Sequence, residues 1–235
     1  MMKFGHISAI AMLSALTLAA PVVASEQDQT ERVDRTVQIR AGGQLRLKNF
    51  SGKVTITGSN RSDMVVHAVR RAPRERLDHI KLEITETASG VSIEANKKDG
   101  NWRDGKSDVV ETEFEIQVPA DVTLDVEVFS SDVFVKGVRG RQRLHTFSGE
   151  IDVVDAEAGI DAETFSGNIV IQLVQGAPAS VEFDSFSGDL DSKVPMTYRS
   201  SANRRVGGAG RTRADIGSGG PDYRFKTFCG DVRIR

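Results

Sequence analysis

Acidic side chains recur at one position of a short phrase that this chain repeats, and they are its first candidates for chemistry. Asp132, Glu150 and Asp189 occupy that position, and Asn168 and Asp231 occupy it in two other copies. Enzymes built on β-helices cleave acidic polysaccharides with clustered acidic, lysine or arginine side chains, often with calcium. Such an enzyme would need two or three of these carboxylates in one cleft.

The composition of this column argues against a reaction centre. It includes Asn168, and the earliest copy of the phrase has Lys53 at the same position. Charges along a strand usually form a solvated face, so we expect these acids to point outward. We therefore predict no catalytic residues and no enzyme, with a carbohydrate-active β-helix enzyme acting on acidic polysaccharide as the alternative.

The histidines indicate no metal site. His67, His79 and His145 lack the spacing of metal ligands, both among themselves and with Cys229. The calcium-binding glycine-aspartate nonapeptide, the Gly-x-Ser-x-Gly elbow, the P-loop and the dinucleotide fingerprint are all absent. We expect neither a metal nor a cofactor.

Cys229 is the only cysteine of the chain, so it has no intramolecular disulfide partner. It takes the place of serine in the last copy of the phrase. We expect a small buried residue there, and the alternatives are a reactive thiol or an intermolecular disulfide.

A group of arginines among glycines could bind phosphate or carboxylate on an envelope polymer. Its members are Arg199, Arg204, Arg205, Arg211 and Arg213. A solvated loop is the simpler interpretation of this group. The formal net charge of −2 disfavours nucleic acid as a partner.

The repeated phrase predicts the fold that positions these residues. Clear copies begin at Phe129, Phe147, Phe165 and Phe186, at intervals of 18, 18 and 21 residues. Self-similarity at such a period indicates one structural unit stacked on copies of itself. At about 3.3 Å per residue, one unit has a perimeter of roughly 60 Å, which suits a narrow β-solenoid. The predicted corners are Ser51, Gly52, Ser130, Ser131, Ser148, Gly149, Ser166, Gly167, Ser187, Gly188, Cys229 and Gly230.

Each unit reads as two short strands joined at a Ser-Gly corner. Glycine there permits a positive φ, and serine can hydrogen-bond a corner amide. The branched residues that follow, such as Ile151, Ile169 and Leu190, are expected to lie above one another inside the stack.

The sequence pattern gives two answers for the direction in which the aromatic column points. The column consists of Phe50, Phe129, Phe147, Phe165, Phe186 and Phe228. Counting back from Ile169 places Phe165 inside, whereas counting forward from Ile160 places it outside. We expect an internal aromatic ladder, because a long exposed apolar column is a liability. If the column faces outward, it is a binding stripe.

The organisation along the chain has three parts. Residues 1–24 have the features of a secretory signal peptide, with Lys3 and His6 before the apolar run Ile7–Ala20 and small residues before Ser25. Residues 25–35 are expected to form a flexible leader, and residues 36–235 one repeat domain. Its early portion should be rich in hairpins, and the irregular region 72–108 should cap it. Because Phe186 and Phe228 are 42 residues apart, we also expect one degenerate rung between them.

The corner phrases, the strand Phe114–Pro119 and the closing Gly230–Ile234 resemble the putative-adhesin β-strand-repeat family of bacterial cell-envelope proteins, a domain of unknown function. The resemblance covers nearly all of the chain after residue 24. It implies an all-β fold, a right-handed single-stranded β-solenoid, exported to the periplasm or cell surface, without catalytic residues. Phenylalanine before Ser-Gly departs from the small residue that is usual in the family.

These observations predict a non-catalytic, exported β-solenoid that acts as a binding or structural module of the envelope. Its partner would be an envelope polymer or protein, and a homo-oligomer could form through the open solenoid ends. No transmembrane segment is expected after cleavage near Ala24. A sensory or regulatory envelope protein is a further alternative.

Overall fold

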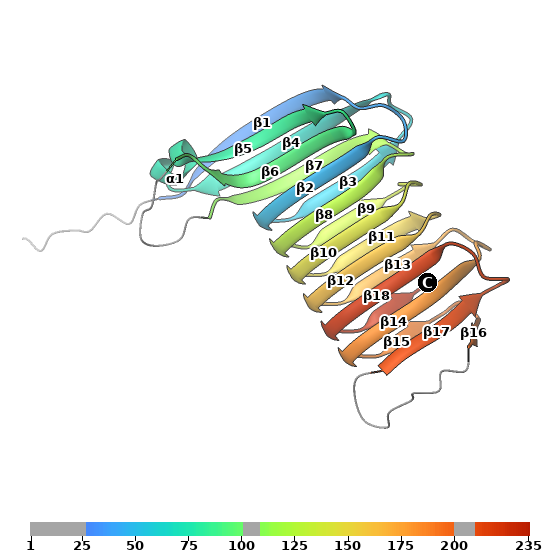
Figure 1. Ribbon diagram of the computed structural model, residues 1–235. Coiled ribbons are helices and arrows are strands. Elements are labelled where there is room, and N and C mark those ends of the chain that lie inside the picture. The colour runs from blue at the N-terminus through green and yellow to red at the C-terminus, as the bar shows by residue number, and fades with distance from the viewer. Residues whose placement is uncertain (1–26, 101–108, 200–209) are drawn as a thin grey trace, which may run out of the picture.

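The computed structural model describes residues 27–100, 109–199 and 210–235. The predicted signal peptide therefore lies outside the described residues. Two β-sheets face each other along the length of the molecule (Figure 1). This arrangement confirms the all-β class.

One sheet has nine strands among the described residues. In spatial order these are β1 (Gln29–Gln38), β4 (Asp63–Ala72), β7 (Glu111–Pro119), β3 (Val54–Ser59), β9 (Val133–Lys136), β11 (Ile151–Ala156), β13 (Ile169–Leu173), β19 (Val232–Ile234) and β15 (Leu190–Ser192).

The facing sheet has ten described strands. Their spatial order is β16 (Met196–Tyr198), β17 (Gly210–Ile216), β14 (Ala179–Ser187), β18 (Asp222–Cys229), β12 (Ile160–Ser166), β10 (Gln142–Ser148), β8 (Thr123–Ser130), β2 (Gln44–Ser51), β6 (Gly90–Lys98) and β5 (Ile80–Thr87).

The repeating unit is a rung in which a strand of the ten-stranded sheet turns at a Ser-Gly corner into a strand of the nine-stranded sheet. The rungs follow one another in the order β2–β3, β8–β9, β10–β11, β12–β13, β18–β19 and β14–β15, with parallel pairing throughout. Strands alternate between buried and exposed residues, because successive side chains of a strand point to opposite faces.

The core lies between the two sheets and consists of columns of branched side chains. Ile151 pairs with Ile169, Ile169 with Val232, and Val232 with Leu190. The predicted column is confirmed, with Val232 inserted into it. Ile151, Ile169 and Val232 are fully buried, so each rung covers the apolar surface of its neighbour.

The order of the last rungs corrects the prediction of a degenerate rung after Phe186. Instead, β16 and β17 continue the ten-stranded sheet at its edge, where β17 pairs antiparallel with β14. The chain then returns, and β18 inserts between β12 and β14 in parallel with both. The copy that comes last in the sequence is therefore not last in the stack.

The other end of the stack is closed by antiparallel strands, which matches the expected hairpin-rich portion. β5 and β6 form an antiparallel pair, and the short helix α1 (Arg74–His79) begins directly after Pro73. β1 begins at Gln29, inside the segment expected to be a loose leader, and pairs with β4 along its whole length. This polar strand shows little alternation because its side chains are mostly exposed, and backbone hydrogen bonds hold it.

Candidate functional site

The Ser-Gly corners stack so closely that a β-carbon would not fit. The corner glycines Gly149, Gly167 and Gly230 have φ values of 150°, 152° and 147°. A β-carbon on Gly167 would lie 2.0 Å from the carbonyl oxygen of Gly149, and one on Gly230 would lie 1.8 Å from that of Gly167. The predicted reason for glycine, a positive φ, is confirmed, and close approach between rungs is a second reason.

Backbone hydrogen bonds join one corner to the next. The amide of Gly149 donates to the carbonyl of Ser166 at 3.1 Å, and the amide of Gly167 donates to that of Cys229 at the same distance. The corner serines and Cys229 are in register across the strands. Buried threonines add hydroxyl contacts, as Thr146 Oγ1 does to the carbonyl of Ser131 at 3.2 Å.

The acidic column bonds to the backbone of neighbouring rungs. Asp132 Oδ1 accepts a hydrogen bond from the amide of Glu150 at 2.9 Å. Asn168 Oδ1 accepts one from the amide of Asp231, and Asp231 Oδ1 one from that of Asp189, both at 3.1 Å. These side chains are distributed one per rung and do not come together at one point. The acidic column therefore connects the corners of neighbouring rungs through hydrogen bonds.

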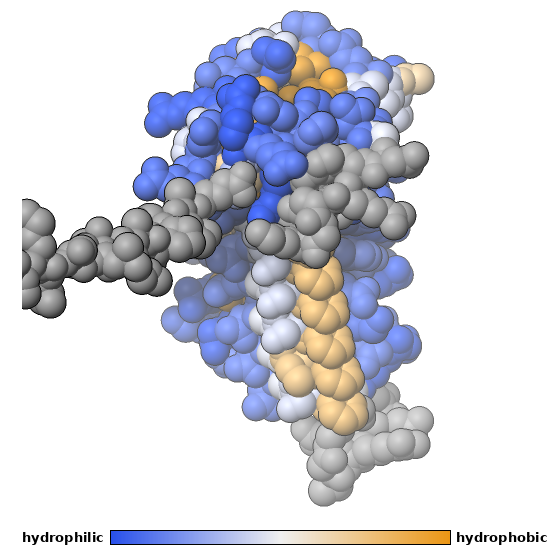
Figure 2. All heavy atoms as spheres, turned by 90° about the vertical axis from the view of Figure 1, so that its left-hand side faces the viewer, coloured by the Kyte–Doolittle hydropathy of each residue, from blue (hydrophilic) through white to orange (hydrophobic). Residues whose placement is uncertain are grey.

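The phenylalanine column lies outside, which corrects the prediction of an internal ladder. Successive rings stack with centroid distances of 4.7–4.9 Å, in the order Phe50, Phe129, Phe147, Phe165, Phe228, Phe186. The side chains are 40–57% exposed. Figure 2 shows them as a continuous apolar band along one edge, beside a paler row.

The exposure of apolar surface that was expected to disfavour an external column is reduced, because the phenylalanine rings cover one another. Phe147 is nearly parallel to both of its neighbours, with interplanar angles of 1° and 2°. Their faces are therefore in contact, and mainly ring edges meet the solvent. The residue before each phenylalanine points inward: it is a threonine or serine in four of the six strands, such as Thr146, and Asn49 or Val128 in β2 and β8. The alternation therefore breaks only after the ring.

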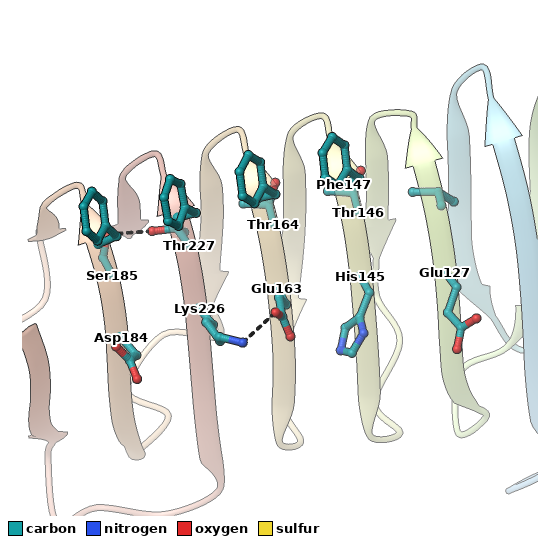
Figure 3. A pocket seen from close by; sticks show the side chains of 14 residues that line it. Glu127, His145, Thr146, Phe147, Glu163, Thr164, Asp184, Ser185, Lys226 and Thr227 are labelled. Carbon is teal, nitrogen blue, oxygen red and sulfur yellow. Dashed lines mark hydrogen bonds and ion pairs between the residues drawn. The ribbon is translucent and has the colours of Figure 1, made fainter. Parts of the chain in front are cut away.

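A groove of about 600 Å³ runs beside the phenylalanine column on the outer face of the ten-stranded sheet (Figure 3). Its other wall is a row of polar side chains two residues before each phenylalanine. Lys226 lies 2.8 Å from Glu163 in this row, and that hydrogen bond raises the pKa of Lys226 above its ordinary value. In spatial order the row is Lys48, Glu127, His145, Glu163, Lys226 and Asp184.

The charges of this face alternate from strand to strand. A second row, two residues further back, reads Arg46, Asp125, Arg143, Asp161, Arg224 and Glu182 in the same spatial order. Each strand thus carries charges of one sign, and its neighbours carry the other. His145 lies where the alternation calls for a cation, between Glu127 and Glu163. Sequence reasoning missed this pattern, although the charge of each outward-facing pair is visible in the sequence.

The predicted arginine group is only partly described, since Arg204 and Arg205 lie outside the described residues. The other three have acidic partners. Arg199 forms an ion pair with Asp215 and lowers the pKa of that carboxyl group. Arg211 lies 3.0 Å from Glu182, and Arg213 lies 3.4 Å from the same side chain. Anion binding by this group stays a prediction, in which a ligand would compete with these carboxylates.

The remaining candidates are dispersed. His67 pairs with Asp34 on β1, far from His145 on β10. Within residues 27–100, 109–199 and 210–235, no three His, Cys, Asp or Glu side chains are grouped so that they could hold a metal ion. Cys229 is exposed, which corrects the expectation of burial. Its position is in register with the corner serines Ser166 and Ser187, at the outer edge.

Comparison with known proteins agrees with this architecture. Residues 122–235 match the family model described as Toastrack DUF4097, which confirms the resemblance to the putative-adhesin family of unknown function. A putative cell adhesion protein from Clostridium sporogenes is similar in structure, with a TM-score of 0.64 and 10% identity over 88% of this chain and 99% of that one. A putative adhesin from Bacteroides fragilis matches 87% of this chain and 97% of its own at 12% identity, with a TM-score of 0.31.

No curated protein sequence matches the chain. Among the described residues, no helix has the length and apolar character needed to cross a membrane.

Proposed function

We propose that this chain, whose residues 122–235 match the Toastrack DUF4097 family model, is a non-enzymatic binding or structural module of the bacterial cell envelope. Its contact surface would be the phenylalanine column together with the adjoining groove. The stack would wind as a right-handed single-stranded β-solenoid, since parallel crossover connections are right-handed in nearly all proteins.

One observation carries the proposal: the exposed phenylalanine column itself. Six aromatic side chains that remain 40–57% exposed form an uninterrupted apolar band among the described residues. Monomeric soluble proteins rarely expose apolar patches of this kind unless the patch binds something. The column also sits on a hydrogen-bonded stack of corners, so little conformational entropy would be lost on binding. A partner with its own repeat would fit best.

Export is the second part of the proposal and is supported by the sequence of residues 1–24. A charged start, an apolar run too short to span a bilayer comfortably and small residues before Ser25 are typical of a cleaved signal peptide. Cell fractionation with N-terminal sequencing of the tagged full chain should recover a product that begins near Ser25 in the periplasm or at the cell surface. Recovery of an intact chain in the cytoplasm would refute this part.

A carbohydrate-active enzyme finds no support in the arrangement of the acids. Asp132, Glu150 and Asp189 lie on three different rungs. The carboxylate of Asp132 accepts a hydrogen bond from the amide of Glu150, and the amide of Asp189 donates one to the carboxylate of Asp231. We therefore propose no reaction.

The binding surface is tested with a column variant and a matched control. Replacing Phe147 and Phe165 by serine should remove retention on isolated envelope fractions, assayed separately for peptidoglycan, lipopolysaccharide and membrane vesicles. Phe134 is a half-buried phenylalanine on the outer face of the other sheet, so Phe134→Ser controls for loss of an aromatic side chain elsewhere. Equal retention of wild type and column variant on every fraction would refute direct contact between the column and these envelope components.

A further inference from the structure

The exposed part of the column is made of ring edges. Interplanar angles of 1–5° between the central rings place their faces against one another, so no open ring face is presented along the column. A sugar ring or a planar ligand stacks on an aromatic face, and between neighbouring rings of the column each such face is covered by the next ring. The band of ring edges instead suits another continuous hydrocarbon surface.

The size of the column suits an interface between two copies. A phenylalanine side chain has roughly 200 Å² of surface. With about half of that exposed, six rings present on the order of 500 Å², and two columns about 1,000 Å². Stable interfaces bury about 1,200–2,000 Å² in total, so two columns plus the rows beside them reach this range.

The charged row beside the column is complementary to itself when one copy is inverted. The described part of the chain forms six rungs, and the signs of the charged row alternate along them. An antiparallel arrangement about a two-fold axis between β10 and β12 brings the first rung opposite the sixth. Lys48 then faces Asp184 of the second copy, and Glu127 faces its Lys226. A parallel arrangement gives no such pairing.

The flank on the corner side adds no charge to this contact. It carries small uncharged side chains in register with one another, namely Ser51, Ser130, Ser148, Ser166, Cys229 and Ser187. No charged side chain of this row would have to leave water when a second copy approaches, so the apolar contact is not opposed there.

We infer that the partner of the phenylalanine column is a second copy of this chain, packed antiparallel about a two-fold axis between β10 and β12. The two columns meet at the centre, and the alternating charged rows pair across the interface. The inference rests on the proposed function, because it names the partner of that same surface. A C₂ contact of this kind is isologous and closes, so it yields a dimer without further growth.

The charge pairing allows a sharp test, because Glu127 and Lys226 are separated by three strand spacings within one chain, roughly 14 Å. They do not contact each other in one copy but face each other across the dimer. Sedimentation velocity of the purified exported chain should show a dimer. Glu127→Lys alone and Lys226→Glu alone should each weaken dimerisation about tenfold or more by juxtaposing like charges.

Mixing the two single variants should restore a dimer that contains one copy of each. In this dimer the lysine that replaces Glu127 in one copy faces the glutamate that replaces Lys226 in the other. The second contact is the native pair of Lys226 with Glu127. A loss of folding in either variant cannot produce this recovery. Phe147→Ser with Phe165→Ser should be monomeric, and Phe134→Ser should dimerise like the wild type. A short bismaleimide should cross-link Ser130→Cys to Cys229 of the second copy faster than it cross-links Ser51→Cys. Ser51 faces Ser187, which lies one strand spacing, about 4.8 Å, from Cys229.

A monomeric wild type at all accessible concentrations, or no recovery on mixing, would overturn the inference. If the wild type is monomeric but the column variant loses retention on vesicles or an envelope polymer, the dimer is wrong while the proposed function holds. If neither dimerisation nor retention depends on the column, both fail.

Discussion

The ammonium group of Lys226 lies 2.8 Å from a carboxylate oxygen of Glu163, 63 positions earlier in the sequence. This contact exists because β18 inserts between β12 and β14. If the rungs followed sequence order, β14 would lie directly on β12. Asp161 and Glu163 would then oppose Glu182 and Asp184, and like charges in direct register are destabilising. The alternating charges therefore favour the observed order.

Replacing Lys226 by glutamate should lower the free energy of unfolding by about 1 kcal/mol. The new carboxylate would lie between Glu163 and Asp184, so three acids would be adjacent. Urea denaturation at low salt measures the effect, and the loss should shrink in high salt because these side chains are exposed. Lys226→Gln, which removes the cation without adding an anion, should lie between wild type and the glutamate variant. An unchanged midpoint for all three would contradict the role of charge in strand order.

Replacing His145 by lysine should raise the free energy of unfolding by about 0.5 kcal/mol at neutral pH. The new cation would complete the alternation between Glu127 and Glu163, as Lys226 does between Glu163 and Asp184. Urea denaturation in low salt is the measurement, with His145→Gln as a neutral control of similar size. If lysine and glutamine have the same effect, charge at this position does not contribute.

Much of the fold was accessible from the sequence because local rules agree with the final structure. The Ser-Gly corners and the column of Ile151 and Ile169 follow from turn chemistry, period and alternation. The position of β18 between β12 and β14 could not be predicted in this way, because the repeat period does not specify which rungs are adjacent in the stack. That information lies in cross-strand charge, such as the pairing of Lys226 with Glu163.

The candidate surface was harder to predict. Parity around Phe165 was ambiguous because the register changes at the corner itself. The argument from exposure also failed, since stacking protects ring faces that an isolated phenylalanine would expose. The polar sequence of β1 likewise shows no alternation of apolar and polar residues. Its pairing with β4 is what identifies it as a strand.

Gly167→Ala should lower the free energy of unfolding by about 3 kcal/mol. Its β-carbon would lie 2.0 Å from the carbonyl oxygen of Gly149, which is held in the corner ladder and cannot retreat without breaking it. Gly176→Ala is the matched control, because Gly176 also has a positive φ, of 78°, but nothing lies within 4 Å of the added carbon. That variant should lose only about 1 kcal/mol of backbone strain. Thermal or urea denaturation distinguishes them, and equal losses would show that strain rather than contact between rungs requires glycine at 167.

Tyr223→Phe should stabilise the protein, and more so at high pH. Tyr223 is 1% exposed, and its hydroxyl group has no hydrogen-bond partner among the described residues, so its removal should gain about 1 kcal/mol at pH 7. Burial raises the pKa of Tyr223 to about 12, with a further contribution from Glu157. As the pH rises from about 10 to about 12, the unfolded chain releases a proton that the folded chain retains, so the wild type loses stability that the variant keeps. Urea denaturation at pH 7 and at about pH 11 should therefore show a gap that widens with pH. Tyr198→Phe removes an exposed phenolic hydroxyl group and is the matched control. A constant difference between wild type and Tyr223→Phe at both pH values would refute the shifted titration of Tyr223.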